Sequence, residues 1–339
     1  MKRLLCLLLI LALCLPGCAR EPEQKQYNAT FLTLFDTVTT VVGKAESEEE
    51  FKAKTQIVHD ELEKYHQLFD IYTDYDGINN LKTVNDQAGI APVTVDSAII
   101  DLLKDCKAYY ESTGGMMNVA LGSVLSLWHE ARDHGFNDPA NAALPEQAAL
   151  EEAARHTDIS KVVIDEGAAT VYLEDPAMRL DVGAVAKGWA AQRVSEVAPE
   201  GLLISVGGNV CATGPKDAQG TPWVVGVQDP QGGDSYLHTL YLTKGSVVTS
   251  GDYQRAYMVE GERYHHIIDP NTLYPGTLWR AVTVVCEDSG LADALSTALF
   301  LLPQAEGQLL LDRFSAEALW VDSSNAITYS PGFQALIRT

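Results

Sequence analysis

The amino-acid sequence predicts an α+β fold with mixed, largely antiparallel sheets and packed helices. Short β-rich runs follow one another through turns rich in Gly or Pro, which favours antiparallel pairing over the long crossovers of a parallel sheet. Helical patterns interrupt these runs, and no Pro/Ser-rich linker divides the chain internally. The 339 residues are 46% hydrophobic, which is enough for a substantial core. We therefore expect one folded domain over residues 30–339.

The first residues have the pattern of a targeting signal. Two basic residues precede an apolar run over residues 4–15, which is typical of a signal peptide and short for a membrane span. The run ends in Leu-Pro-Gly-Cys at Cys18, which resembles a bacterial lipobox. We expect residues 1–17 to be a lipoprotein signal peptide, Cys18 to be lipidated, and residues 18–29 to form a polar linker. The lipid would hold the protein on the extracytoplasmic face of the bacterial cell membrane; a secreted protein or a retained anchor helix is the alternative.

The first half of the chain begins with a strand pattern and continues with helices. Apolar and polar residues alternate over residues 31–45, which predicts a strand. Residues 47–72 predict a long helix, because Ser47 and Glu50 form a capping box ahead of apolar residues at helical spacing.

Two more helices are expected before the middle of the chain. Residues 96–115 form an amphipathic pattern that ends at Gly114 and Gly115, and residues 146–156 form a shorter one. The segment between them, residues 116–135, is expected to line or support the functional site.

The second half is mostly β-rich. Residues 161–197 predict two strands around a turn and then a helix beginning near Ala184. A buried helix is expected over residues 291–302 and a closing strand pair near residues 317–330. Between them the β-rich runs are residues 202–214, 222–230, 237–251, 256–270 and 281–288.

Charge and cysteine content exclude several classes of protein. The formal net charge is −22, and removal of Lys2 and Arg3 with a signal peptide makes it more negative. Such a balance repels nucleic acid, so DNA or RNA binding is not expected. Outside the targeting segment the cysteines are Cys106, Cys211 and Cys286, isolated from one another. This spacing argues against a disulfide framework or a zinc site, and we interpret them as small buried hydrophobic residues.

Common nucleotide, hydrolase and zinc motifs are absent. The sequence contains no GxGxxG, GxxxxGK[ST] or GxSxG pattern. His129 and His134 are five residues apart, about 140° around a helix, so they cannot both face one zinc ion. We interpret both histidines as surface or structural residues.

Five polar, mostly glycine-containing segments are the strongest functional signal. Gly183 allows close backbone approach to a ligand, a helix beginning near Ala184 presents free N–H groups to an anion, and Lys187 adds a positive charge. The segments are DVGAVAKGWA (181–190), SVGGNVCATG (205–214), VTSGDYQRAY (248–257), HHIIDPNT (265–272) and DALST (293–297).

The last of these segments contains a candidate metal site. Asp293 and Thr297 lie at i and i+4, on one helix face about 5–6 Å apart. Mg²⁺ accepts a carboxylate and a neutral oxygen and keeps other positions for water or phosphate oxygens, and Asp181 is a further oxygen donor. Alternatively, Thr297 bonds to the carbonyl of residue 293, and Asp293 interacts with the dipole of its own helix near a cap at Ser289.

The other segments also have structural interpretations. Lys187 alone is an ordinary solvated helix residue, and His266 alone an ordinary structural imidazole. The GGN and TSGDY runs are also compatible with simple tight turns.

Together, the ordered segments from LFDT at residues 34–37 to ADALSTALF resemble the ApbE family of FAD:protein FMN transferases. The resemblance covers nearly all of the chain from about residue 30. It implies Mg²⁺-dependent transfer of the FMN half of FAD to a Ser or Thr hydroxyl of an acceptor protein, with release of AMP. In this family the usual acceptors are membrane redox subunits.

The resemblance also implies roles for individual residues. Asp293, Thr297 and the backbone carbonyl of Ala184 would hold Mg²⁺, Asp181 and Lys187 would contact FAD, and His266 would take the proton of the attacking hydroxyl. Further flavin contacts would fall at Phe35, Tyr72, Met116, Met117, Asn118 and Ile267. The sequence departs from the family pattern at Phe35-Asp36-Thr37, where Met-Gly-Thr is usual, at Asn118, where Asp is common, and at His265, where Ser is usual.

Two other functions remain open from the sequence. Water in place of the acceptor hydroxyl would make the protein an FAD pyrophosphatase that yields FMN and AMP. A lipoprotein that binds flavin without chemistry is the second alternative, and it predicts FAD recovered intact.

Overall fold

The computed structural model describes residues 24–233 and 235–338. Cys18 and the expected signal peptide lie outside these residues. Within the described part, none of the helices combines the length and the apolar character needed to cross a membrane.

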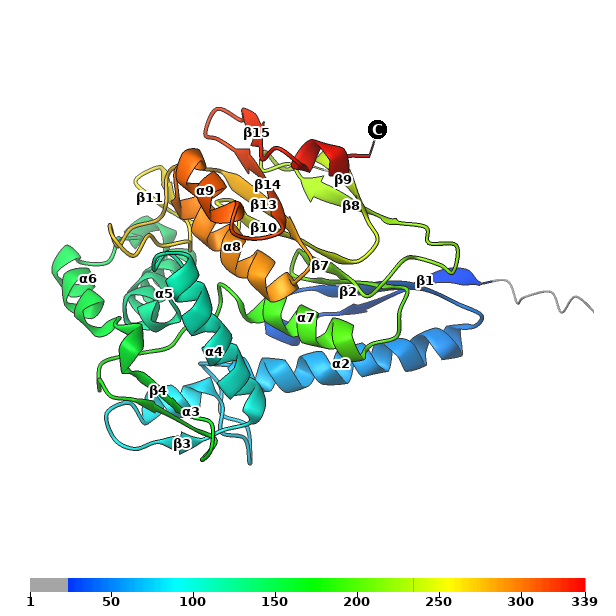
Figure 1. The fold of residues 1–339 in the computed structure, drawn as a ribbon. Helices are drawn as coiled ribbons and strands as arrows, with labels where there is room; N and C mark the ends of the chain where they lie inside the picture. Colours follow the sequence, from blue (N-terminus) through cyan, green and yellow to red (C-terminus); the bar gives the residue numbers. More distant parts are fainter. Residues whose placement is uncertain (1–23, 234, 339) are drawn as a thin grey trace, which may run out of the picture.

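An eight-stranded sheet is the frame of the fold (Figure 1), and its strands lie in the order β1, β2, β6, β7, β10, β13, β14, β15. Each neighbouring pair is antiparallel, and the three smaller sheets are antiparallel too. The predicted α+β fold is therefore confirmed. The strands of the large sheet are β1 (Lys25–Phe31), β2 (Thr39–Ala45), β6 (Leu202–Val206), β7 (Asn209–Ala212), β10 (Gly245–Gly251), β13 (Ala281–Cys286), β14 (Ala316–Val321) and β15 (Ile327–Tyr329).

The two faces of the large sheet bury different clusters, as the alternation of side chains along a strand requires. Val248 packs beneath helix α8 (Ser289–Leu301), whereas its neighbour Val247 packs on the opposite face. There the hairpin of β8 (Trp223–Gln228) and β9 (Tyr236–Leu242) covers the sheet.

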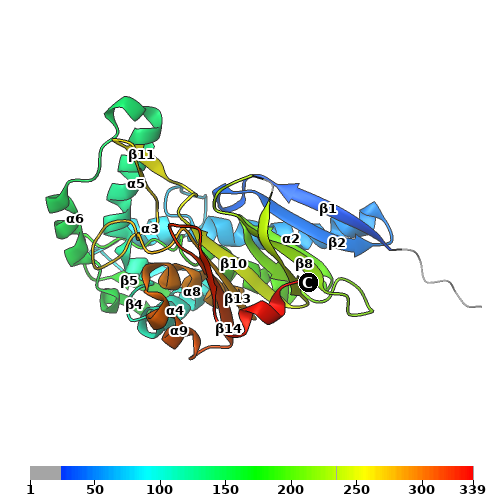
Figure 2. The same ribbon diagram turned by 90° about the horizontal axis from the view of Figure 1, so that it is seen from above.

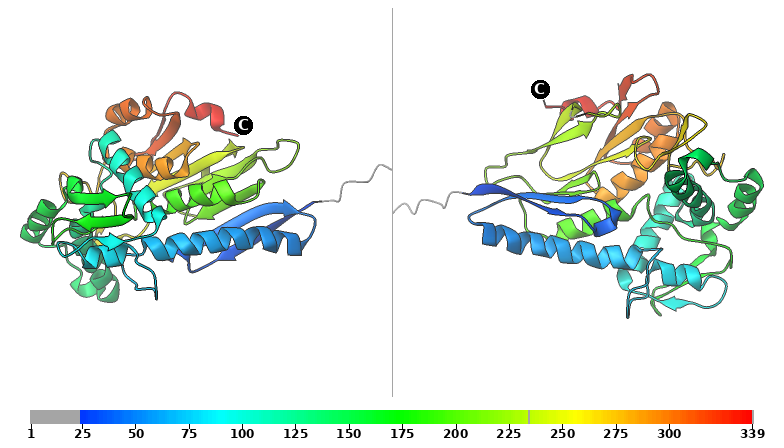
Figure 3. Two further views of the ribbon diagram at one scale, coloured as in Figure 1. Left: turned by 60° about the horizontal axis from the view of Figure 1, so that its bottom comes forward. Right: turned by 180° about the vertical axis from the view of Figure 1, so that it is seen from behind.

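Three helices lie along the face that carries the functional site. Helix α7 (Ala186–Val197) contacts both α8 and α2 (Glu48–Phe69). Figure 3 shows α2 running beside the hairpin of β1 and β2 and beneath α7. The start of α7 is therefore fixed between two other helices.

The remaining helices gather mainly at one end of the sheet (Figures 1 and 2). Trp128 anchors α5 there, because its ring is buried and its indole N–H donates to the Leu273 carbonyl at 2.9 Å. The elements outside the large sheet are α3 (Leu81–Asp86), α4 (Ser97–Ser112), α5 (Gly122–Asn137), α6 (Gln147–Ala153), α9 (Gln304–Leu311), β3 (Val93–Thr94), β4 (Val162–Asp165), β5 (Thr170–Leu173), β11 (Tyr257–Val259) and β12 (Glu262–Tyr264).

Several local predictions are confirmed. The Ser47 hydroxyl accepts from the Glu50 N–H at 3.1 Å at the start of α2. Gly114 and Gly115 follow α4 with positive φ values of 63° and 86°, conformations that stop a helix at little cost to glycine. The three cysteines of the described part are buried and unpaired.

The strand expected over residues 31–45 is wrong, because the chain turns within it. A short 3₁₀ helix (Leu34–Asp36) separates β1 from β2, and Phe35 and Asp36 have left-handed φ values of 54° and 50°. Because polar and apolar residues alternate on both sides of the turn, the sequence pattern did not indicate that the strand is interrupted there. In addition, β1 begins at Lys25, inside the segment that we expected to be a linker.

Two helix starts also differ from the prediction. Helix α7 begins at Ala186 rather than near Ala184, because the N–H of Val185 and that of Ala186 bond to the Val182 carbonyl in a preceding turn. The cap of α8 is Asp288, whose side chain accepts from the Leu291 N–H at 2.8 Å, and not Ser289.

Candidate functional site

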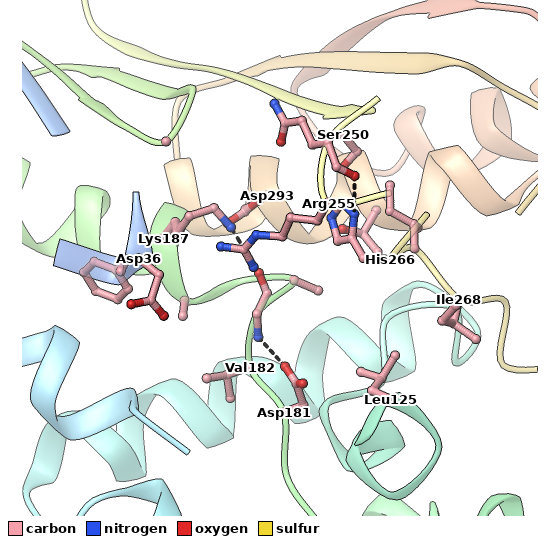
Figure 4. Close-up of a pocket in the computed structure, with 18 of the residues that line it drawn as sticks. Asp36, Leu125, Asp181, Val182, Lys187, Ser250, Arg255, His266, Ile268 and Asp293 are labelled. Carbon is pink, nitrogen blue, oxygen red and sulfur yellow. Dashed lines mark hydrogen bonds between the residues drawn. The ribbon is translucent and has the colours of Figure 1, made fainter. Parts of the chain in front are cut away.

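A pocket lies where the loops at one end of the large sheet meet the helical part of the chain. All of the expected site residues within the described part line this pocket, so the structure brings together segments more than 250 residues apart (Figure 4). They are Phe35, Tyr72, Met116, Met117, Asn118, Asp181, Ala184, Lys187, His266, Ile267, Asp293 and Thr297. Their chemical roles remain predictions.

Asp293 reaches the pocket from the buried helix α8. Its side chain is only 5% exposed, and burial raises the pKa of its carboxyl, an effect that the nearby Lys187 ammonium opposes. One carboxylate oxygen accepts from the backbone N–H of Gly188 at 2.8 Å. Asp288 caps α8, so the Asp293 carboxylate is not needed at the start of its own helix. It accepts a hydrogen bond from the first turn of α7 instead.

Gly188 is required where α7 crosses α8. A Cβ at this position would overlap the Ser289 carbonyl oxygen and the Asp293 side chain. The absence of a side chain thus allows the close approach that places a buried carboxylate against a backbone donor.

The oxygen atoms around Asp293 suit a hard cation, and a nearby amide N–H suits a phosphate group. Thr297 lines the pocket one turn further along α8, and the Asp293 carbonyl accepts from the Ser296 hydroxyl at 2.9 Å, with no bond from Thr297 found in the described residues. A carboxylate, a free hydroxyl and the Ala184 backbone are therefore available as oxygen ligands. The buried Asn209 amide lies close enough to Asp293 to lower the pKa of its carboxyl. Its nitrogen has no partner within hydrogen-bond distance among the described residues, so it can also donate to an anionic oxygen.

Lys187 and Asp181 are held by the turn before α7. The Lys187 ammonium donates to the Gly183 carbonyl at 3.1 Å, and the Gly183 N–H donates to Asp181 at 2.8 Å. Figure 4 shows both contacts, with Lys187 and Arg255 pointing into the space beside Asp293. Lys187 is thus the cation that acts on the buried acid, whereas Arg132 lies near Tyr72 and His129.

His266 is fixed as a neutral imidazole with one free nitrogen. Its Nδ1 lies 3.1 Å from the Gln254 carbonyl oxygen, and because a carbonyl only accepts, Nδ1 carries the proton and Nε2 has the lone pair. Burial lowers the pKa of His266 to about 3, reinforced by the charges of Arg255, His265 and Lys187. Nε2 is available to accept a proton.

The departures from the family pattern have local explanations. His265, where Ser is usual, is buried, with Nε2 donating to the Gly276 carbonyl at 2.8 Å and Nδ1 accepting from the Ile267 N–H at 3.2 Å. Asn118 bonds at both ends of its amide, to the Thr157 carbonyl and the Ala120 N–H. A carboxylate at position 118 could make only the second of these bonds.

Phe35 and Asp36 are shaped by the turn between β1 and β2. Asp36 has φ of 50° at the position where the family usually has Gly, and Asp adopts this region more readily than most residues. The Phe35 N–H donates to His66 Nδ1 at 3.2 Å, and the two rings meet edge-on. The unusual dipeptide therefore keeps the turn.

His129, which the sequence indicated only as a surface or structural residue, is part of the pocket. It lines the pocket, with Nδ1 at 2.9 Å from the Tyr72 hydroxyl and Nε2 at 3.8 Å from Asp181. The spacing to His134, which is exposed, excluded a shared zinc ion but contained no information about partners distant in sequence.

Other pocket residues were also missed by sequence reasoning. Arg255 stood inside the TSGDYQR segment and has a left-handed φ of 46°, so the motif itself contained a signal. Asp36, His66 and Arg132 also line the pocket, and no periodicity or spacing in the sequence marks the last two.

Comparison with known proteins shows close similarity to one family. A sequence model of the ApbE family matches residues 35–320. The chain is 36% identical over 277 residues to the FAD:protein FMN transferase of Treponema pallidum, covering 76% of this chain and 75% of that protein. It is 33% identical to a protein of the same name from Klebsiella pneumoniae, covering 80% and 86%.

Solved structures agree with this comparison. The crystal structure of the ApbE protein from Thermotoga maritima superposes with a TM-score of 0.82 at 30% identity, covering 93% of this chain and all of that one. The flavin transferase ApbE from Vibrio cholerae has the same fold, with a TM-score of 0.76 at 20% identity and coverage of 93% and 100%.

Proposed function

The chain belongs to the ApbE family, and from this premise we propose that it is an FAD:protein FMN transferase. It transfers the FMN half of FAD to a Ser or Thr hydroxyl of an acceptor protein and releases AMP. The observation that carries this proposal is the convergence of Asp293, Thr297, Lys187 and His266 in one pocket.

The pocket offers a place for the pyrophosphate of FAD. Asp293, Thr297 and the carbonyl of Ala184 would hold Mg²⁺, which neutralises phosphate charge and polarises the phosphorus when it is bound. Lys187 and Arg255 add positive charge beside them, and the buried Asn209 amide can donate to a phosphate oxygen. These two cations matter in a chain whose net charge is −22, since FAD is itself an anion.

His266 acts as the base in the transfer. Its Nε2 accepts the proton of the acceptor hydroxyl, whose oxygen forms a bond to the phosphorus on the riboflavin side of FAD. The bond from that phosphorus to the bridging oxygen breaks, and AMP leaves with the bonding electrons. Phosphates close to Arg255 and Lys187 offset two of the charges that lower the pKa of His266, so bound substrate makes this base stronger.

Dependence of AMP release on the acceptor protein distinguishes transfer from the two alternative functions. We propose incubating the purified protein with FAD and Mg²⁺, with and without a candidate acceptor, and measuring AMP and FMN. Transfer predicts AMP release that depends on the acceptor. Equal AMP and free FMN without an acceptor would indicate hydrolysis instead, and intact FAD under all conditions would indicate a protein that only binds flavin.

The expected targeting signal supports a proposal for the cellular location, and the family resemblance supports one for the class of acceptor. We propose that Cys18 carries the lipid anchor and that the enzyme works on the extracytoplasmic face of the cell membrane. Membrane redox subunits with covalently bound FMN are then the acceptors, because they lie on the same surface.

A further inference from the structure

His129 joins two pocket residues that come from different parts of the chain. Tyr72 lies in the loop after α2, His129 in the middle of α5, and Asp181 in the segment before α7. Building on the FAD-binding role proposed above, we propose that His129 is a positioning residue that fixes Tyr72 and Asp181 for FAD and thereby sets the affinity for the dinucleotide.

The contacts define the state of the imidazole. Its Nε2 lies 3.8 Å from an Asp181 carboxylate oxygen, which is too far for a direct hydrogen bond, but the negative charge of the carboxylate favours the proton on that nitrogen. Nδ1 is then an acceptor, and the Tyr72 hydroxyl donates to it at 2.9 Å. Burial lowers the pKa of His129 below its usual value, which keeps the ring neutral and preserves this arrangement.

His129 is itself rigidly placed. The preceding residue, Trp128, is buried and bonded to the Leu273 carbonyl, which anchors this turn of α5. Because α5 is fixed, the hydrogen bond from Tyr72 to His129 also restrains Tyr72 in its loop.

Tyr72 depends on His129 more than Asp181 does. The Tyr72 side chain is 61% exposed, so little packing restrains its ring, and the bond to His129 limits its rotamers. Asp181 uses its other oxygen to accept from the Gly183 N–H at 2.8 Å, and its backbone N–H donates to the Val119 carbonyl at 2.8 Å. The second carboxylate oxygen lies 3.8 Å from His129 Nε2 and interacts with the imidazole only electrostatically.

The proposal predicts a change in substrate affinity with little change in turnover. His129→Ala should raise the Kd and the KM for FAD about five- to tenfold, the range expected for a lost hydrogen bond, with kcat within about twofold of wild type. Tyr72→Phe should raise them by a smaller factor, and adding Tyr72→Phe to His129→Ala should have no further effect.

Two conservative variants separate the contacts. An Asn side chain at position 129 reaches as far as Nδ1 and can accept from Tyr72, whereas Gln reaches as far as Nε2 and can donate to Asp181. His129→Asn should therefore recover most of the affinity lost in His129→Ala, and His129→Gln should match Tyr72→Phe. His134→Ala, on the exposed side of the same helix, is the control and should bind FAD as wild type does.

The outcomes are measured by calorimetric titration with FAD and Mg²⁺ and by steady-state transfer to an acceptor. An unchanged Kd in His129→Ala, or a lower kcat at constant KM, would overturn the positioning role. If His129→Ala does not fold, the affinities of His129→Asn, His129→Gln and Tyr72→Phe for FAD test the positioning role instead. Equal affinity in all three variants would also overturn that role. Failure of the wild-type protein to bind FAD would instead contradict the proposed function.

Discussion

Asp293 combines a carboxylate with almost complete burial, and that combination defines the site. An isolated buried charge is costly unless it is paired or hydrogen-bonded. Here the Gly188 N–H and the charge of Lys187 stabilise it in part, while burial still raises its pKa. A divalent cation would complete this compensation, which supports the metal site proposed at Asp293.

The low pKa of His266 makes the stability of the protein depend on pH. The group is neutral in the folded state down to about pH 3, whereas an unfolded histidine takes up a proton near pH 6.5. As the pH falls from about 6.5 toward 3, the unfolded state therefore binds more protons and the folded state loses stability. The contribution of His266 should be on the order of 1–2 kcal/mol at pH 5.

Urea unfolding at pH 8 and pH 5 tests this expectation in the absence of FAD. The His266→Gln variant should lose less stability than wild type between the two values, whereas His134→Gln, at an exposed position, should behave as wild type. An equal loss in wild type and His266→Gln would show that His266 is not held neutral by the fold.

Site residues inside a sequence motif could be predicted, whereas an isolated site residue could not. Segments rich in Gly and Asp identified Asp181, Lys187 and Asp293, because each motif contains its own chemistry. His129 was missed, since its partners Tyr72 and Asp181 are more than 50 residues away in the sequence. Only the packing of α5 beside the loop after α2 brings them together.

At the scale of elements, the crossing of α7 and α8 positions the reactive groups. Gly188 permits the close approach, Asp293 bonds across it, and Lys187 is adjacent in the sequence. The nearly continuous apolar run predicted α8 well, because a buried helix is apolar nearly all round. The start of α7 was misplaced, since the turn from Val182 to Val185 has no marker as strong as a capping residue.

Gly188→Ala should separate these two helices. We expect a loss of about 2–4 kcal/mol in the free energy of unfolding, the range of overpacked or strained cores, together with loss of transfer activity. Gly167→Ala is a suitable control, because a Cβ there meets its nearest neighbour at an ordinary distance of 3.4 Å. A Gly188→Ala protein with wild-type stability and activity would contradict the role of this crossing.

At the scale of the whole molecule, the pocket exists only because the large sheet and the helical part of the chain meet. Its lining runs from Phe35 to Thr297, so no fragment contains the site. The fold class could be predicted from the order of strand and helix patterns. The hairpin of β1 and β2 could not, because its turn depends on left-handed backbone at Phe35 and Asp36 that alternation of polarity does not reveal.

The proposed location of the enzyme makes a prediction for the mature protein. Intact mass spectrometry of the membrane fraction should find a chain that begins at Cys18 and carries lipid, and Cys18→Ser should lack the lipid. Cys106→Ser, which changes a buried thiol, is the control and should remain lipidated. A mature chain that retains residues 1–17 or has an unmodified Cys18 would exclude the anchor.

The central claim is that the acid on α8 supports transfer of FMN to another protein. The most direct measurement is the mass of a candidate acceptor co-expressed with wild type or with Asp293→Asn, a variant that keeps an oxygen to accept from Gly188 but loses the charge. Asp60→Asn, on the exposed surface of α2, is the control. We predict an added FMN phosphoester with wild type and Asp60→Asn and at least a hundredfold less with Asp293→Asn, the effect of roughly 3 kcal/mol on a transition state. Full labelling by folded Asp293→Asn would contradict the account.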